Sequence, residues 1–160
     1  MNGWQFSGIT SFQSGAPLGI SVATTTNIDI TGTPSITPRA LLTGNLILSK
    51  GQRTFFQNFN TAAVQLPAVG TFGNAARNVI RGPGINDFDL ALMKNLPVRE
   101  RLHLQVRWEA YNAFNHTQFS TVNTSANFNP ATGQQINAQF GAFTATRDPR
   151  QLQISARLVF

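Results

Sequence analysis

Four segments of this sequence alternate apolar and polar side chains with a period of two residues. The alternation is clearest over residues 150–160, where Leu152 and Ile154 fall on one face and Gln151 and Gln153 on the other. Successive side chains of a β-strand point to opposite faces, whereas a helix would mix both classes around its circumference. We therefore predict four β-strands, which lie near residues 4–12, 87–95, 101–114 and 150–160.

The connections between these strands are of two very different lengths. Residues 95–100 form a short turn that contains Pro97, and they should join the second and third strands into a hairpin. Residues 14–86 and 115–149 are rich in Gly, Pro, Asn, Thr and Ser and have no sustained helical pattern. Connections of that length are unusual in compact domains, but membrane barrels alternate short periplasmic turns with long extracellular loops. We expect an all-β fold: an incomplete, antiparallel transmembrane β-barrel segment of about four strands with two long extracellular loops.

The composition agrees with a sheet whose two faces meet different environments. Only 11% of the 160 residues are charged, against about 25% in typical soluble domains. No apolar run reaches the roughly 20 residues of a membrane-spanning helix. The net charge is +6, but the basic residues are scattered singly, so no stripe that could follow nucleic-acid phosphates is present. The sequence has no cysteine, which excludes disulfides, thiolate metal sites and a cysteine nucleophile.

Charged residues on the polar faces of the second and third strands are the candidate site. Two carboxylates with a histidine are able to hold a divalent cation or to transfer protons. We favour a structural interpretation, in which Asp87 or Asp89 lies opposite Arg107 and the pair contributes about 0.2–1 kcal/mol. A charge facing lipid near the membrane midplane costs about 2–4 kcal/mol, so these side chains should face the lumen. The predicted lumen-facing set is Asp87, Asp89, His103, Arg107 and Glu109, and we expect no metal, no cofactor, no catalytic residue and no enzymatic activity.

The apolar faces carry most of the aromatic side chains near the ends of the strands. Such side chains belong either to a soluble core or to the aromatic girdle of a membrane barrel. Lys94 shares the apolar face, and we expect it at a strand end, where it can reach the headgroups. The terminal Phe160 resembles the C-terminal signal that delivers outer-membrane proteins to the barrel-assembly machinery. The predicted lipid-facing girdle consists of Trp4, Phe6, Phe12, Trp108, Phe114 and Phe160.

Several motifs, in order along the chain, resemble the C-terminal part of Oar-like TonB-dependent outer-membrane transporters. Residues 3–8 (Gly-Trp-Gln-Phe-Ser-Gly) and 12–17 (Phe-Gln-Ser-Gly-Ala-Pro) carry the first part of the resemblance. Residues 70–78 (Gly-Thr-Phe-Gly-Asn-Ala-Ala-Arg-Asn), followed by Arg-Gly-Pro-Gly at 81–84, carry the second. The third comprises residues 107–116 (Arg-Trp-Glu-Ala-Tyr-Asn-Ala-Phe-Asn-His) with Phe119, and Arg-Gln-Leu-Gln at 150–153 leading to Phe160.

The resemblance implies a location in the cell outer membrane and a plugged 22-stranded barrel energised through TonB for the uptake or export of a solute. The sequence shows no signal peptide, plug or TonB box, so we expect residues 1–160 to be a C-terminal part of such a barrel. The implied partners are outer-membrane lipid, the barrel-assembly machinery through the last strand, the remainder of the barrel as upstream chain, and TonB through N-terminal parts. Basic loop residues are expected to meet lipopolysaccharide phosphates; they are Arg39, Arg53, Arg77, Arg81 and Arg147.

The alternative hypothesis is a soluble β-sandwich that acts as an adhesin or a carbohydrate-binding module. Polar loops and exposed aromatic side chains suit contacts with sugars. A sandwich needs further strands within both long loops, and residues 40–49 and 55–64 are the candidates in the first.

Overall fold

The computed structural model of the chain describes residues 3–33 and 35–160. These residues form strands and two 3₁₀ turns, with no α-helix among them. No helix in the described part is long and apolar enough to cross a membrane. The chain divides into two units: the sheet unit (Met1–Ser14, Gly84–Gln118 and Arg147–Phe160) and the loop unit (Gly15–Pro83 and Phe119–Thr146).

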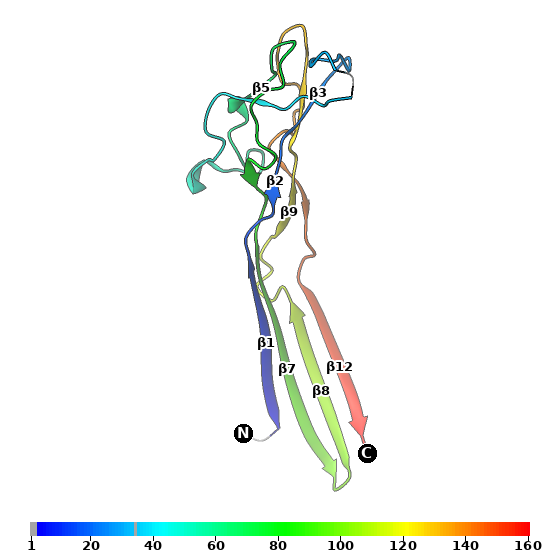
Figure 1. The fold of residues 1–160 in the computed structure, drawn as a ribbon. Coiled ribbons are helices and arrows are strands. Elements are labelled where there is room, and N and C mark those ends of the chain that lie inside the picture. The colour runs from blue at the N-terminus through cyan, green and yellow to red at the C-terminus, as the bar shows by residue number, and fades with distance from the viewer. Residues whose placement is uncertain (1–2, 34) are drawn as a thin grey trace. The chain divides into compact units, whose positions relative to one another are not determined.

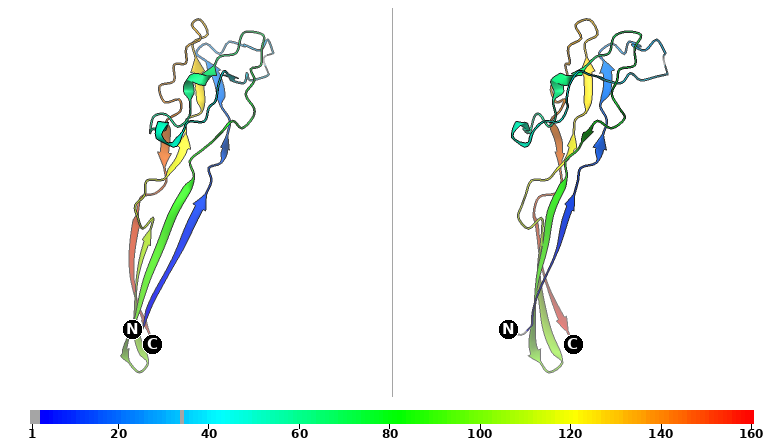
Figure 2. Two further views of the ribbon diagram at one scale, coloured as in Figure 1. Left: turned by 90° about the vertical axis from the view of Figure 1, so that its left-hand side faces the viewer. Right: turned by 60° about the vertical axis from the view of Figure 1, so that its left-hand side comes forward.

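The sheet unit contains one four-stranded sheet with the order β1-β7-β8-β12, and every neighbouring pair is antiparallel. Figure 1 shows the four strands side by side, and Figure 2 shows how they twist about one another. The β7–β8 turn, the start of β1 and the end of β12 all lie at one end of this sheet, and both long connections leave from the other (Figure 1). The four strands found are therefore those expected from the alternation, and their bounds are Trp4–Gln13 (β1), Ile85–Arg99 (β7), Leu102–Tyr111 (β8) and Gln151–Val159 (β12).

The β7–β8 hairpin turns later in the chain than its proline suggested. Arg99 pairs with Leu102, so the two-residue loop is Glu100–Arg101, and Pro97 lies within β7 opposite His103. The backbone N–H of Asn95 donates to the Gly3 carbonyl, on the β1 side. Two residues on, the nitrogen of Pro97 faces that same side, so its missing N–H removes no bond of the β7–β8 ladder. The predicted turn over residues 95–100 was therefore placed too early.

Strand β8 ends at Tyr111, three residues before the predicted end at Phe114. Asn112 and Asn115 adopt left-handed backbone conformations with φ of 47° and 51°, which no strand can contain. The side chain of Asn112 then holds the turn: its Oδ1 accepts from the His116 N–H at 3.0 Å, and its Nδ2 donates to the His116 carbonyl at 3.1 Å. Asparagine tolerates this backbone region better than most residues, which explains why it interrupts the apolar face here.

The two long loops contain more regular structure than the predicted four strands allowed. They carry eight short strands, which form four separate two-stranded sheets (β3–β10, β9–β11, β2–β6 and β4–β5). All of these strands have two to four residues, too few for a visible alternation. Their bounds are Pro17–Leu18 (β2), Ser21–Thr24 (β3), Leu41–Leu42 (β4), Val64–Gln65 (β5), Ile80–Arg81 (β6), Phe119–Val122 (β9), Ser125–Phe128 (β10) and Phe143–Thr146 (β11), and the 3₁₀ turns are Lys50–Gln52 (η1) and Thr61–Ala63 (η2).

The loop unit has a hydrophobic core of its own. Phe59 and Phe128 are its largest fully buried side chains, and the Phe59 ring meets the Phe140 ring edge-on at 5.2 Å. Residues 70–78 are held by backbone geometry as well: a β-carbon at Gly73, where φ is 72°, would collide with the Arg39 and Ala40 carbonyls. The core comprises Val22, Ala40, Leu46, Phe59, Ala63, Val64, Ala75, Ile80, Val122, Ala126, Phe128 and Phe140.

The soluble-sandwich alternative required strands in both loops, and both loops do contain them. Residues 40–49 and 55–64 contribute only β4 and the first residue of β5, which pair with each other. A sandwich consists of two extended sheets packed face to face. The sheet unit has one sheet and the loop unit only two-stranded sheets, so neither unit is a sandwich.

Candidate functional site

The register of the four-stranded sheet divides its side chains into an apolar and a polar face. Phe6 lies opposite Leu92, Leu92 opposite Trp108, and Trp108 opposite Ile154, so one row of large apolar side chains crosses all four strands. The side chains of this row do not form a core: Phe6 is 70% exposed and Ile154 73%. The apolar face is therefore open over the full width of the sheet.

Aromatic rings lie on this apolar face toward both ends of β1. At the end where the long connections leave, the Phe88 ring meets Phe12 edge-on at 5.7 Å and Phe114 at 5.0 Å. At the other end, the Lys94 Nζ lies 4.8 Å from the centre of the Trp4 ring. Lys94 pairs with the first residue of β1 but is five residues from the end of β7, so its expected place at the end of its own strand was wrong. A cation over an aromatic face contributes about 0.5–1 kcal/mol at exposed sites, which offsets the placement of a charge among apolar neighbours.

One member of the predicted aromatic set lies inside a strand, and another follows directly after the end of one. Trp108 is inside β8, between Leu92 and Ile154. Phe160 follows the last residue of β12 and is 99% exposed. The Phe160 side chain is therefore not covered by any of the described residues.

The predicted lumen-facing residues all occupy the opposite, polar face of the sheet. They divide into three groups along it. Asp87 and Asp89 lie near the start of β7, Arg107 and Glu109 lie within β8, and His103 lies near the hairpin, opposite Pro97 and Val159. The structure therefore does not gather the two aspartates and the histidine around one point.

The expected cross-strand pairing of an aspartate with Arg107 is wrong. Met93 lies opposite Arg107, because the turn is further along the chain than predicted. Arg107 instead donates to the Glu109 carboxylate on its own strand at 2.7 Å, and Tyr111 donates to the same carboxylate oxygen at 3.3 Å. Residues at i and i+2 share a strand face, which brings the three side chains into one hydrogen-bonded row.

The two aspartates serve the end of the sheet where β8 turns away. The Asp89 carboxylate accepts the backbone N–H of Asn112 at 3.0 Å, and Asp87 accepts that of Phe88 at 3.0 Å. Gln118 holds the start of β7 in the same way: its amide accepts the Asn86 N–H at 3.0 Å and donates to the Asn86 carbonyl. These side chains therefore accept backbone N–H groups beyond the point where the β7–β8 ladder ends.

A shallow polar pocket of about 360 Å³ lies at this end of the polar face. No group of three or more His, Cys, Asp or Glu side chains suited to a metal ion occurs within the described ranges. The sequence assigned Asp87, Asp89 and Gln151 to polar strand faces and named Arg147 as a basic loop residue, but nothing in it predicted that they line one pocket. The lining residues are Asp87, Asp89, Tyr111, Asn112, Arg147, Asp148, Pro149 and Gln151.

The outer strands of the sheet are each paired on one side only. β1 pairs with β7, and β12 pairs with β8, and the described residues supply no further partner to either strand. An unpaired strand edge presents a row of N–H and C=O groups. The sheet is thus an open wall with two free edges.

Comparison with known protein families places the chain in a family of membrane barrels. The model of the family described as "Outer membrane beta barrel domain" matches residues 1–153, which is almost the whole chain. The comparisons with curated proteins and with solved structures found no match.

Proposed function

The chain belongs to the outer membrane β-barrel domain family and is an outer-membrane protein, and from this premise we propose that its sheet is part of the wall of a TonB-dependent, Oar-like transporter. The observation that carries the proposal is the exposed apolar face that runs in register across all four strands. In this interpretation that face meets lipid and the polar face meets the lumen. The sequence motifs that resemble the Oar-like family support the choice of transporter class.

The dimensions of the strands support a membrane wall. A transmembrane strand needs about 9–11 residues. β1 and β8 have ten residues each and β12 has nine. On β1, the apolar face from Trp4 to Phe12 spans eight residue steps, or about 27 Å along the strand at 3.4 Å per residue, and at a tilt of about 40° this covers about 20 Å of the roughly 25 Å apolar band of such barrels.

The distribution of charge supports the same orientation. The side chains of Asp89, Arg107 and Glu109 lie on the polar face, where lumen water would solvate them. Facing lipid, charged side chains cost up to about 2–4 kcal/mol each near the midplane. Lys94 is the charged residue of the apolar face, and it lies beside Trp4 at the end of β1, at interfacial depth in this orientation.

The two free edges require further strands. The smallest transmembrane barrels have eight strands, and unpaired backbone groups in lipid cost several kcal/mol each. We propose that additional barrel strands, from the same polypeptide or from another, pair with β1 and β12. The long connections would then lie outside the cell and the β7–β8 turn in the periplasm.

The remaining partners follow from this placement. Arg39, Arg53, Arg77, Arg81 and Arg147 would lie on the outside, where lipopolysaccharide phosphates are available. The barrel-assembly machinery would recognise β12 with the exposed Phe160, and TonB would act through a plug domain. We expect no enzymatic activity.

An analysis of the protein in its native outer membrane tests this proposal. An antibody against the loop unit should detect a detergent-extracted barrel larger than the 17.4 kDa of this chain, and TonB should be recovered with it after cross-linking in cells. Recovery of the barrel without TonB in the cross-linked product would contradict the transporter class alone. A cooperatively folded 17.4 kDa monomer in buffer without detergent would contradict the whole proposal.

A further inference from the structure

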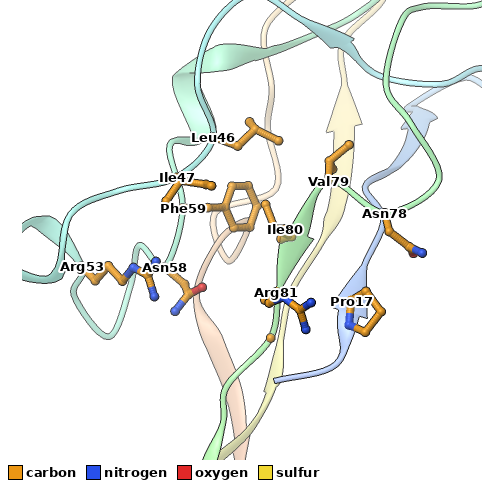
Figure 3. Close-up of a pocket in the computed structure, with 11 residues that line it drawn as sticks. Pro17, Leu46, Ile47, Arg53, Asn58, Phe59, Asn78, Val79, Ile80 and Arg81 are labelled. Carbon is orange, nitrogen blue, oxygen red and sulfur yellow. The ribbon is translucent and has the colours of Figure 1, made fainter. Parts of the chain in front are cut away.

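The loop unit contains a pocket of about 560 Å³ whose walls differ in chemistry. Figure 3 shows Phe59 and Ile80 at its centre, with Arg53 and Asn58 to one side and Arg81 to the other. Leu46, Val79 and Pro17 extend the apolar lining. Small-molecule sites typically have volumes of about 300–1,000 Å³ and combine such apolar walls with a few polar groups.

The charges around this pocket are all positive. The loop unit has five basic residues and one acidic residue, Asp29, so its net charge is 5 − 1 = +4. Asp29 does not line the pocket; its carboxylate accepts the backbone N–H groups of Thr31 and Gly32. The two guanidinium groups therefore face the pocket without a carboxylate to neutralise them.

Each of these arginines is held by one backbone carbonyl and keeps further donors. The Nε of Arg53 donates to the Leu48 carbonyl at 3.1 Å, and one terminal nitrogen of Arg81 donates to the Gly15 carbonyl at 3.1 Å. A guanidinium carries five N–H donors in a planar fork, which suits the oxygens of carboxylates and phosphates. Both guanidinium groups are thus held in place and keep N–H donors that can bind a ligand.

The amide of Asn58 adds a buried polar group beside Arg53. Asn58 is only 7% exposed and lines the pocket. Its backbone N–H donates to the Gly141 carbonyl, whereas its side-chain amide has no hydrogen-bond partner among the described residues. The oxygen and nitrogen of this amide are not among the buried polar atoms that lack a partner, so they reach the open pocket and are available to a bound molecule.

We propose that this pocket binds a small organic anion, with its carboxylate or phosphate between Arg53 and Arg81 and its apolar body against Phe59 and Ile80. Hydrogen bonds between guanidinium groups and oxyanions are charge-assisted and roughly twice as strong as neutral ones. The apolar wall selects against inorganic anions, which cannot use it. This inference goes beyond the proposed function, because every lining residue belongs to the loop unit and none to the barrel wall.

The test is isothermal titration of the full chain, reconstituted in lipid nanodiscs, with 1-naphthyl phosphate as the probe. The double variant Arg53→Gln/Arg81→Gln should lower the affinity at least tenfold, while glutamine retains an N–H donor for the Gly15 carbonyl. The matched control is Lys50→Gln/Arg101→Gln, which removes the same charge from the chain at positions outside the pocket and outside the proposed lipopolysaccharide contacts, and it should change the affinity less than twofold. Asn58→Leu, which keeps four side-chain heavy atoms branched at Cγ and breaks no hydrogen bond of the described chain, should lower it about threefold.

Two further ligands and a folding check complete the test. Inorganic phosphate and neutral 1-naphthol should each bind at least tenfold more weakly than 1-naphthyl phosphate. Protease resistance of the loop unit should be equal in all variants. Equal losses in the two double variants, tight binding of 1-naphthol, or no binding of the probe to the intact chain would overturn the proposal.

A competition experiment distinguishes the two sources of such an anion. Nanodiscs that contain lipopolysaccharide should weaken probe binding if a phosphorylated lipid headgroup is the natural occupant. Unchanged probe binding in those nanodiscs supports a soluble organic acid or phosphate as the occupant.

Discussion

Phenylalanine occurs thirteen times in this chain, and the three buried ones, Phe59, Phe128 and Phe140, all lie in the loop unit. In the loop unit, Phe59 is 1% exposed and packs edge-on against Phe140. In the sheet unit, Phe6 and Phe12 are 70% and 71% exposed, although both lie on the apolar face of the sheet. One unit therefore carries its own core, whereas the other has an apolar face that the described residues leave uncovered and that lipid covers in our proposal.

The difference shows what each unit depends on. The loop unit buries apolar surface within itself, and each Å² of buried apolar surface stabilises the fold by about 25 cal/mol. Its short strands provide few ladder hydrogen bonds, so we attribute its stability mainly to this packing. The sheet unit has long ladders and buries few side chains, so its stability should depend on the surrounding membrane and on strands that cover its edges. Substitutions that probe these two kinds of environment can break or sharpen the contrast.

The largest effect is expected in the loop-unit core. Phe128→Ala should lower the free energy of unfolding by about 3–5 kcal/mol, because it removes a fully buried ring from a closed core. Phe6→Ala in the sheet unit should leave the protease resistance of the loop unit unchanged. The measurement is urea-dependent proteolysis of the loop unit in detergent, and equal effects of the two variants would show that the units do not differ as described.

The next effect tests the apolar face of the sheet. Ile154→Arg should destabilise the membrane-inserted state by about 2–4 kcal/mol, since it places a charge toward lipid within β12. Gln153→Arg, one residue earlier and opposite Glu109, is the matched control and should be close to neutral. Both are measured by reversible unfolding from lipid bilayers, and a larger penalty for the Gln153 variant would reverse the assignment of the faces.

A smaller effect is expected where β8 ends. Asn112→Ala should cost about 2 kcal/mol, because it removes the hydrogen bonds to the His116 backbone and forces alanine into a left-handed conformation. Asn112→Gly removes the same hydrogen bonds but fits the backbone, so it should cost less. Unfolding curves of the two variants separate the loss of the hydrogen bonds from the strain of the left-handed backbone. A glycine variant that is less stable than the alanine variant would contradict the contribution of backbone strain.

The smallest effect concerns the charged row on the polar face. A double-mutant cycle of Arg107→Gln and Glu109→Gln should give a coupling energy of about 0.2–1 kcal/mol, because the arginine side chain is half-exposed. The same cycle for Arg107→Gln and Asp89→Asn should give no coupling. A significant coupling with Asp89 would favour the cross-strand pair over the pair within β8.

The sheet unit could be predicted from the sequence because its strands are long and meet two environments. A period of two over ten residues is visible without any structure, and it assigned Asp87, Asp89, His103, Arg107 and Glu109 to one face. The partners of those residues could not be predicted, because they depend on register. Pro97 was assigned to the turn, whereas its nitrogen faces the β1 side of β7, where a missing N–H removes no β7–β8 bond.

The loop unit was largely beyond sequence reasoning. Strands of two to four residues are too short for an alternation, and the unit is closed by contacts between distant residues such as Phe59 and Phe140. The organic-anion pocket could not be predicted for the same reason, since Arg53 and Arg81 are 28 positions apart and only Arg81 lies in a motif. The sequence named Arg53 and Arg81 only as two of five basic loop residues and gave no sign that they share a pocket.

The most direct test of the lipid-facing sheet uses the absence of native cysteine. Single cysteines are introduced at Phe6, Leu92 and Ile154 on the apolar face and at Ser7, Ala91 and Ser155 on the polar face, and each is labelled with a fluorophore in bilayers that contain spin-labelled lipid chains. The account predicts strong quenching by lipid at the first three positions and weak quenching at the other three. Equal quenching on both faces, or stronger quenching on the polar face, would contradict it.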